Sequence, residues 1–139
     1  MSINAQEFRN SKNYPDYIIQ DRLNLYRTIT IRQEDLKPIR ERIKIVEGRI
    51  FKGIFTNLRQ GNQITFVASN DPYNFVRCKV ISTKRYNNFK EMLQGEGFQN
   101  CLPSAPSLQK AVAVYNGMFG YRDQVTIHGT LAIRIEVID

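Results

Sequence analysis

Hydrophobic and polar residues alternate in several short segments of the chain, and this period of two is typical of β-strands. Near the N-terminal end Ile29 and Ile31 lie between polar neighbours, and further along Val76, Cys78 and Val80 would share one face. The expected strands are residues 26–32, 45–51, a segment through Ile64 and Phe66, 75–81 and 129–138. We expect turns at Gly61-Asn62 and across residues 70–74.

Other segments have apolar residues at helical spacing. Residues 34–44 predict a helix with Leu36, Ile39 and Ile43 on one side. A second helix is expected after Asn88, because Glu91 three residues later resembles a capping box, and a third after Ser107. The order is therefore strand, helix, three strands, two short helices and a strand. This order predicts a small mixed β-barrel of about five strands, with an open α+β sheet as the alternative.

The charge is positive and unevenly distributed. Lys and Arg total 20 against 13 Asp and Glu, a formal net charge of +7. Residues 27–59 hold nine basic and four acidic side chains, and residues 77–90 hold five basic side chains and no acid. Two basic segments on one face would attract phosphate groups.

Other features limit the function classes. The two cysteines and single histidine form neither a disulfide framework nor a zinc site, so no metal and no cofactor is expected. His128 precedes Gly129 and is expected to be a turn residue. We see no membrane span and no signal sequence, so we expect a cytoplasmic protein, and we expect a monomer.

The strand at residues 45–51 contains two opposite charges, Glu47 and Arg49, with Gly48 between them and Lys44 just before. Residues two apart point the same way, so Glu47 and Arg49 face one side together. At a barrel mouth this pair would be neutralised and still offer hydrogen bonds to a ligand. On an exposed edge it would be an ion pair of little energetic value. Gly48 would allow close approach of another group.

The pattern Lys44-x-x-Glu47-x-Arg49 after an amphipathic helix resembles the signature of ASCH domains, in the PUA-like superfamily. The resemblance continues, in the family's order, through "GNQITF", "KVISTKRYNNFKEML", "CLPSAPSLQKAVAVYNGMF" and "HGTLAIRIEV". It covers roughly residues 25–138, so we divide the chain into an N-terminal extension (1–24) and an ASCH-like domain (25–139). It implies an α+β fold, a PUA-like barrel with short flanking helices and a cleft beside residues 44–49. It also implies a role with RNA, as a binding protein, a ribonuclease or an acetylcytidine-type amidohydrolase.

The candidate catalytic residues are Lys44, Glu47 and Glu96. Lys44 would be a nucleophile only if its pKa were depressed, because the neutral amine is the reactive form. Glu47 or Glu96 would then carry the proton. In the ASCH-like deacylases the resemblance implies a lysine, a threonine and a glutamate, and this chain has Glu47 at the threonine position.

A binding function needs neither a nucleophile nor a proton carrier. Lys44, Arg49, Lys84 and Arg85 would contact phosphates or base edges, Glu47 would accept from an exocyclic amine, and Tyr86 would stack on a base. The expected partner is RNA or a nucleotide. A protein-interaction module is the remaining alternative, with Phe8, Tyr14 and Tyr17 as its docking residues.

Overall fold

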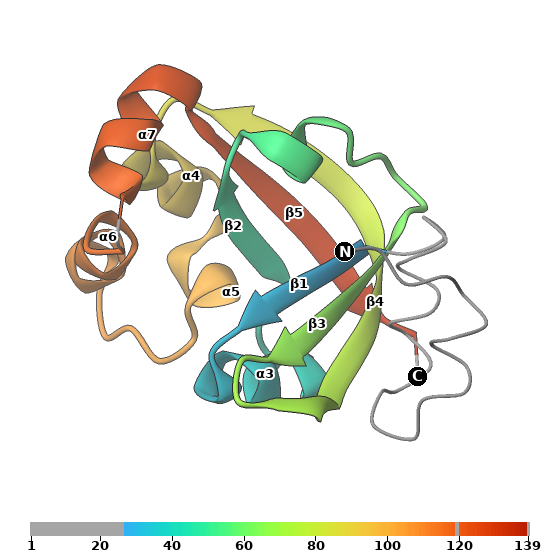
Figure 1. Ribbon diagram of the computed structural model, residues 1–139. Helices are drawn as coiled ribbons and strands as arrows, with labels where there is room; N and C mark the ends of the chain where they lie inside the picture. Colours follow the sequence, from blue (N-terminus) through green and yellow to red (C-terminus); the bar gives the residue numbers. More distant parts are fainter. Residues whose placement is uncertain (1–26, 119, 139) are drawn as a thin grey trace.

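A computed structural model describes residues 27–118 and 120–138, and it contains one five-stranded mixed sheet (Figure 1). The strands, in spatial order, are β1 (Arg27–Ile31), β3 (Gln63–Ala68), β4 (Asp71–Tyr86), β5 (Thr130–Val137) and β2 (Val46–Ile50). Strand β1 is parallel to β3, and every other pairing is antiparallel. The α+β class and the five strands expected from the sequence are confirmed, but β4 is longer at both ends than the expected 75–81.

The sheet curls into a half-barrel. Its long central strand β4 shifts register between Val80 and Ser82, where it pairs with β5, and such bulges increase local twist and bending. Strands β1 and β2 are the two edges of the sheet and do not pair with each other. The expected barrel is therefore open along one seam, between β1 and β2.

The helices lie on two sides of this sheet (Figure 1). Helix α3 (Gln33–Arg40) lies at one end of the half-barrel, and the short helix η1 is Gly53–Thr56. Four helices gather beside β2: α4 (Phe89–Glu96), α5 (Phe98–Cys101), α6 (Leu108–Asn116) and α7 (Tyr121–His128). None of the helices in the described ranges has the length and apolar character needed to cross a membrane.

Each face of the sheet packs on its own hydrophobic cluster. Leu131 and Ile133 of β5 belong to the interior cluster with Leu36 of α3. Val46 and Ile50 of β2 belong to the second cluster, which the four helices cover. Because side chains alternate along a strand, the intervening residues of β2 point away from these helices.

Both helix starts expected from capping residues are confirmed. The Asn88 side chain accepts a hydrogen bond from Glu91 N at 2.8 Å, and the Ser107 hydroxyl accepts one from Lys110 N at 3.2 Å. These bonds satisfy backbone donors that a helix leaves without partners in its first turn.

Three local expectations were wrong. Residues 71–74 belong to β4 rather than to a turn, and the hairpin turns at Ser69-Asn70 instead. Helix α3 ends at Arg40, because Arg42 has a positive φ of 63° and the chain reverses there. His128 ends a helix, α7, that the sequence did not predict; none of its residues is buried, so the apolar pattern is weak.

Gly129 connects α7 to β5, and its conformation favours glycine. Its φ is 71° and its ψ is −167°, and a Cβ added there would lie 2.8 Å from the carbonyl oxygen of Tyr86. Its own carbonyl accepts a hydrogen bond from Phe51 N at 3.1 Å, just after β2. This glycine therefore fixes where β2, β4 and α7 meet.

We expect Gly129→Ala to lower the free energy of unfolding by about 3 kcal/mol, since it combines a strained φ with a backbone clash. Gly53→Ala is the matched control, because Gly53 also has a positive φ (63°) but nothing lies within 4 Å of its added Cβ. The control should lose about 1 kcal/mol. Urea denaturation of both variants measures this, and equal losses would contradict the clash at Gly129.

Candidate functional site

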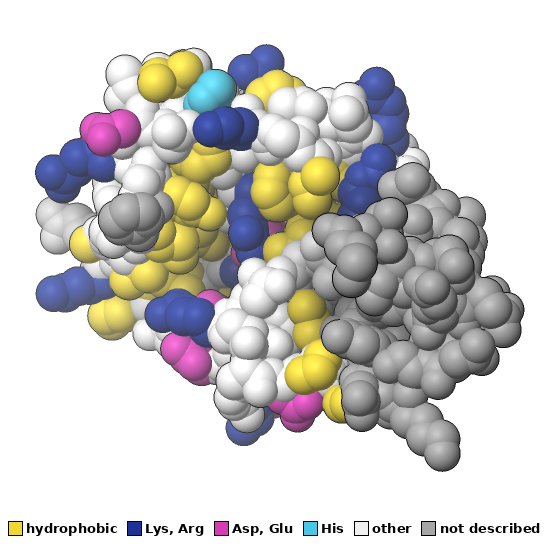
Figure 2. Space-filling view, viewed as in Figure 1, with side chains coloured by type: hydrophobic (Ala, Val, Ile, Leu, Met, Phe, Trp, Pro, Cys, Tyr) yellow, Lys and Arg dark blue, Asp and Glu magenta, His cyan; other side chains and the backbone are white. Residues whose placement is uncertain are grey.

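A cleft of about 580 Å³ lies beside the Lys44–Arg49 segment, at the open seam of the half-barrel. Strands β1 and β2 form one wall, and α6, α7 and the segment before α7 form the other. Figure 2 shows a hollow on this face, with Lys and Arg side chains inside it and hydrophobic side chains along its walls. The implied cleft beside residues 44–49 is thus present in the structure.

The alternation of β2 places two charged side chains at this seam. Glu47 and Arg49 pair with Ile133 and Leu131 of β5, so they face the interior of the half-barrel. Gly48 faces the opposite way, where a Cβ would lie 2.5 Å from Met92 Cε and 3.1 Å from Tyr115 Cε1. The close approach expected at Gly48 therefore comes from helix side chains.

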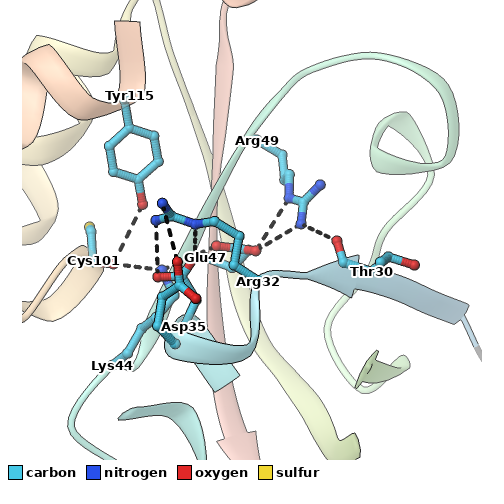
Figure 3. Close-up of polar contacts among 9 residues, drawn as sticks. Thr30, Arg32, Asp35, Lys44, Glu47, Arg49, Cys101 and Tyr115 are labelled. Carbon is cyan, nitrogen blue, oxygen red and sulfur yellow. Dashed lines mark hydrogen bonds and ion pairs between the residues drawn. The ribbon is translucent and has the colours of Figure 1, made fainter. Parts of the chain in front are cut away.

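The carboxylate of Glu47 lies between two cations (Figure 3). Its Oε1 is 3.2 Å from Lys44 Nζ, and its Oε2 accepts from Arg49 Nε and Nη2 at 3.2 and 3.1 Å. Lys44 also donates to the Cys101 carbonyl at 2.6 Å. Lys44 and Glu47 are 5% and 6% exposed, so this is a buried charge network rather than a surface ion pair.

The network controls the protonation of its members. Burial lowers the pKa of Lys44, but Glu47, Tyr115 and Asp35 together outweigh burial, and the pKa lies above its ordinary value. Burial raises the pKa of Glu47, but Lys44 and Arg49 outweigh it, and the pKa lies below its ordinary value. Lys44 is therefore an ammonium ion at neutral pH, opposite to the depressed pKa that a nucleophilic lysine requires.

Arg49 also connects the two edges of the sheet. Its Nη2 donates to the Thr30 carbonyl of β1 at 3.5 Å, and its guanidinium lies 5.5 Å from the centre of the Phe55 ring. Because β1 and β2 share no ladder hydrogen bonds, this side chain makes a polar contact across the open seam.

The cleft contains functional groups that the sequence analysis missed. Arg32 and Asp35 form an ion pair at 2.9 Å at the cleft, and their side chains are 54% and 23% exposed. Tyr115 of α6 and Tyr121 of α7 line the opposite wall. The Tyr115 hydroxyl donates to the Cys101 carbonyl at 3.4 Å, so it shares an acceptor with Lys44. A tyrosine in a helix pattern is usually a packing residue, and no local signal distinguishes this one.

Glu96, the third candidate catalytic residue, does not line the cleft, and its side chain has other partners. It accepts from the Tyr86 hydroxyl through Oε2 and from Arg134 Nε through Oε1, the latter at 2.9 Å. Arg134 pairs with Val46 in the sheet register and faces the helices, whereas Glu47 faces the interior. The structure thus gives Glu96 polar partners on the other face of the sheet. Burial and the hydrogen bond to Glu96 raise the pKa of Tyr86 to about 12.

The second basic segment lies outside the cleft. Arg85 and Tyr86 line a separate groove with His128 and the last turns of α7. The Arg85 guanidinium lies 3.9 Å from the centre of the Phe51 ring, and Lys84 Nζ lies 5.3 Å from the centre of the Tyr86 ring. The predicted binding residues therefore divide into Lys44, Glu47 and Arg49 at the cleft and the Lys84–Tyr86 segment near the second groove.

Residues 27–118 and 120–138 contain no group of three or more His, Cys, Asp or Glu residues that could hold a metal ion. Both cysteines, Cys78 and Cys101, are buried. The docking residues Phe8, Tyr14 and Tyr17, and the extension 1–24 to which they belong, lie outside the described residues.

Solved structures share this fold, although no protein-family model and no curated protein matches the sequence. The hypothetical protein PH0355 superposes with a TM-score of 0.71 and 29% identity, over 80% of this chain and 97% of that one. The protein PF0455 from Pyrococcus furiosus superposes with a TM-score of 0.68 and 27% identity, over 82% of this chain and 98% of that one.

The third similar structure is a mutant form of ZmASCH from Zymomonas mobilis. It superposes with a TM-score of 0.54 and 13% identity, over 81% of this chain and 72% of that one. The chain has the fold of an ASCH domain. The resemblance found in the sequence motifs is confirmed at the level of the fold.

We expect Glu47→Gln to lower the free energy of unfolding by about 3–5 kcal/mol, because it leaves the buried Lys44 ammonium without its counter-charge. Asp35→Asn is the control, since its partner Arg32 is half exposed and such pairs contribute about 0–1 kcal/mol. Urea denaturation of both variants gives the comparison. Similar small losses in both would show that Glu47 does not balance a buried charge.

The same network predicts the pH dependence of stability. The pKa of Glu47 is lower in the folded state than its ordinary value of 4.5, so its contribution is present above pH 4.5 and is lost as pH falls through the folded pKa. The pKa of Lys44 is raised, so its contribution is lost only as pH rises through the folded pKa. Unfolding free energies measured across acidic pH should therefore fall less steeply in Glu47→Gln than in the wild type, and parallel curves would contradict this.

Proposed function

We propose that the protein binds RNA, or a nucleotide unit of it, in the seam cleft lined by Lys44, Glu47 and Arg49. The observation that carries this proposal is that two arginines, Arg32 and Arg49, line a cleft whose opposite wall includes the partly exposed Tyr121. Guanidinium groups suit phosphates and base carbonyls, and aromatic side chains suit the flat faces of bases.

The charge of the cleft favours a ligand that is rich in hydrogen-bond acceptors. Three cations, Arg32, Lys44 and Arg49, line it against two carboxylates, Asp35 and Glu47. Both carboxylates are already paired with these cations. The net positive charge and the remaining donors of the guanidinium groups favour phosphate or carbonyl oxygens over amines. The cleft volume of about 580 Å³ is within the usual range for small-ligand sites, roughly 300–1,000 Å³.

Within this proposal Lys44 and Glu47 position the ligand-binding group. Both Glu47 oxygens have partners, so we propose that Glu47 fixes the Arg49 guanidinium instead of accepting from an exocyclic amine. A guanidinium fixed before binding loses less side-chain entropy when a phosphate arrives. This role also explains why a buried carboxylate lies in the middle of a strand.

A hydrolase function using Lys44 has less support. The amine is protonated because Glu47 raises its pKa, and Glu96 binds Arg134 and Tyr86 instead of Lys44. No contact among the described residues joins the three into one catalytic group. We therefore keep RNA binding as the proposed function.

The test is binding of a fluorescein-labelled single-stranded RNA by fluorescence anisotropy. We expect Arg32→Gln and Arg49→Gln each to weaken binding about tenfold, since a charge-assisted hydrogen bond contributes roughly 1.5–3 kcal/mol. Affinity should also fall with salt, and each variant should reduce the slope of log K against log salt by about 0.7.

The matched control is Lys79→Gln, which removes one exposed positive charge from β4 outside the cleft. Its affinity should stay within about twofold of wild type. Equal losses in the control and the arginine variants would mean that net charge, rather than the cleft, attracts RNA. No salt-dependent binding by the wild type would reject the proposed function.

A further inference from the structure

A second groove lies beside the last turns of α7, and the proposed function has not used it. It is lined by Arg85, Tyr86 and Asn87 at the end of β4 and by residues 125–129, with a volume of about 580 Å³. Glu91 is the acidic residue among its lining residues. Figure 2 shows Lys and Arg side chains around the single histidine, beyond the hollow that marks the cleft.

Helix α7 connects the groove to the cleft. Tyr121, its first residue, lines the cleft, and His128, its last residue, lines the groove. They are seven residues apart, which corresponds to about 10 Å along the helix axis at 1.5 Å per residue. A stacked single strand advances about 3.4 Å per nucleotide, so about three nucleotides would cover this distance.

A cation lies between the two ends of this path. Lys52, just after β2, is exposed, and its Nζ donates to the Gln124 side chain at the middle of α7 at 3.2 Å. Arg85 then lies over the ring of Phe51, the residue before Lys52. Lys52 therefore lies beside the middle of α7, between the helix end at the cleft and the helix end at the groove.

These outer cations differ from those of the cleft in their partners. Lys44 and Arg49 are neutralised by Glu47, whereas Lys52, Lys84 and Arg85 form no ion pair within the described ranges. Aromatic rings hold Arg85 and Lys84 at 3.9 and 5.3 Å from the ring centres. A cation held by a ring keeps its charge and its edge donors available for a phosphate.

We propose that the groove is a second RNA subsite, in which Arg85 binds a backbone phosphate about three nucleotides away from the base held in the cleft, and that Lys52 binds a phosphate between the two sites. This inference rests on the proposed function and deepens it, because it makes the ligand a single strand of several nucleotides rather than a free nucleotide. Phosphate contacts carry no sequence information, so the subsite adds affinity and direction but no base preference.

The experiment compares two labelled RNA ligands, a mononucleotide and a single-stranded nonanucleotide, in anisotropy titrations against the wild type and the double variant Lys52→Gln/Arg85→Gln. The nonanucleotide should bind the wild type more tightly than the mononucleotide. The double variant should lose at least tenfold affinity for the nonanucleotide and about 1.4 in its salt slope, while mononucleotide binding changes less than twofold.

The control removes two other exposed charges, with Lys37→Gln/Lys79→Gln on α3 and near the middle of β4, and neither residue lines the cleft or the groove. It should bind both ligands like the wild type. Arg85 also packs on Phe51 and donates to the His128 carbonyl, so its substitution could affect the fold. Lys52→Gln alone changes one exposed side chain, and its salt slope should fall by about half as much as that of the double variant.

The possible results distinguish the second subsite from the cleft and from an effect of net charge. An equal loss for both ligands, or no loss for either, overturns the second subsite while leaving the cleft intact. A loss in the control equal to that in the double variant also overturns it, because net charge would explain the effect. If the wild type binds neither ligand, the proposed function fails, and the subsite fails with it.

Discussion

A buried carboxylate, Glu47, is the group on which the open seam depends. It lies between Lys44 and Arg49, and the two buried charges, Lys44 and Glu47, depend on this pairing, since burying an unpaired ion costs several kcal/mol. Once paired, Arg49 is held where its guanidinium contacts the Thr30 carbonyl of β1. A half-barrel with unpaired edges thereby gains a polar contact across its opening, at the place where the cleft forms.

The two faces of the sheet have different roles, because one packs against the helices and the other carries the charges at the seam. The helix-covered face carries Val46 and Ile50, and it also pairs Glu96 with Arg134. The interior face carries Glu47 and Arg49 at the seam. Although β2 is an edge strand only five residues long, four of its five residues are buried, and Arg49 is partly exposed. The edge strand therefore supports the helices with alternate residues and presents the charge network with the others.

Much of this arrangement follows from local patterns. The period-two segments give four of the strands within a few residues, and Asn88 and Ser107 mark helix starts through hydrogen bonds that involve residues three apart. The extent of β4 could not be predicted, because Asp71 pairs with Ala68 of β3 despite its turn-forming residue type, and residues 82–86 join the strand through pairing with β5. Helix α7 was missed because an exposed helix needs no apolar stripe.

The sequence by itself determined that Glu47 and Arg49 share a face, because alternation in a strand is a property of the backbone. It also determined the excess positive charge and the ASCH-like order of motifs. Only the tertiary structure decided which charges meet. Tyr115 and Cys101 come to Lys44 from more than fifty residues away, and Glu96 pairs across the other face of the sheet. The separation of Arg85 from the cleft is likewise set by strand order and helix packing, which act between segments distant in the chain and leave no local pattern.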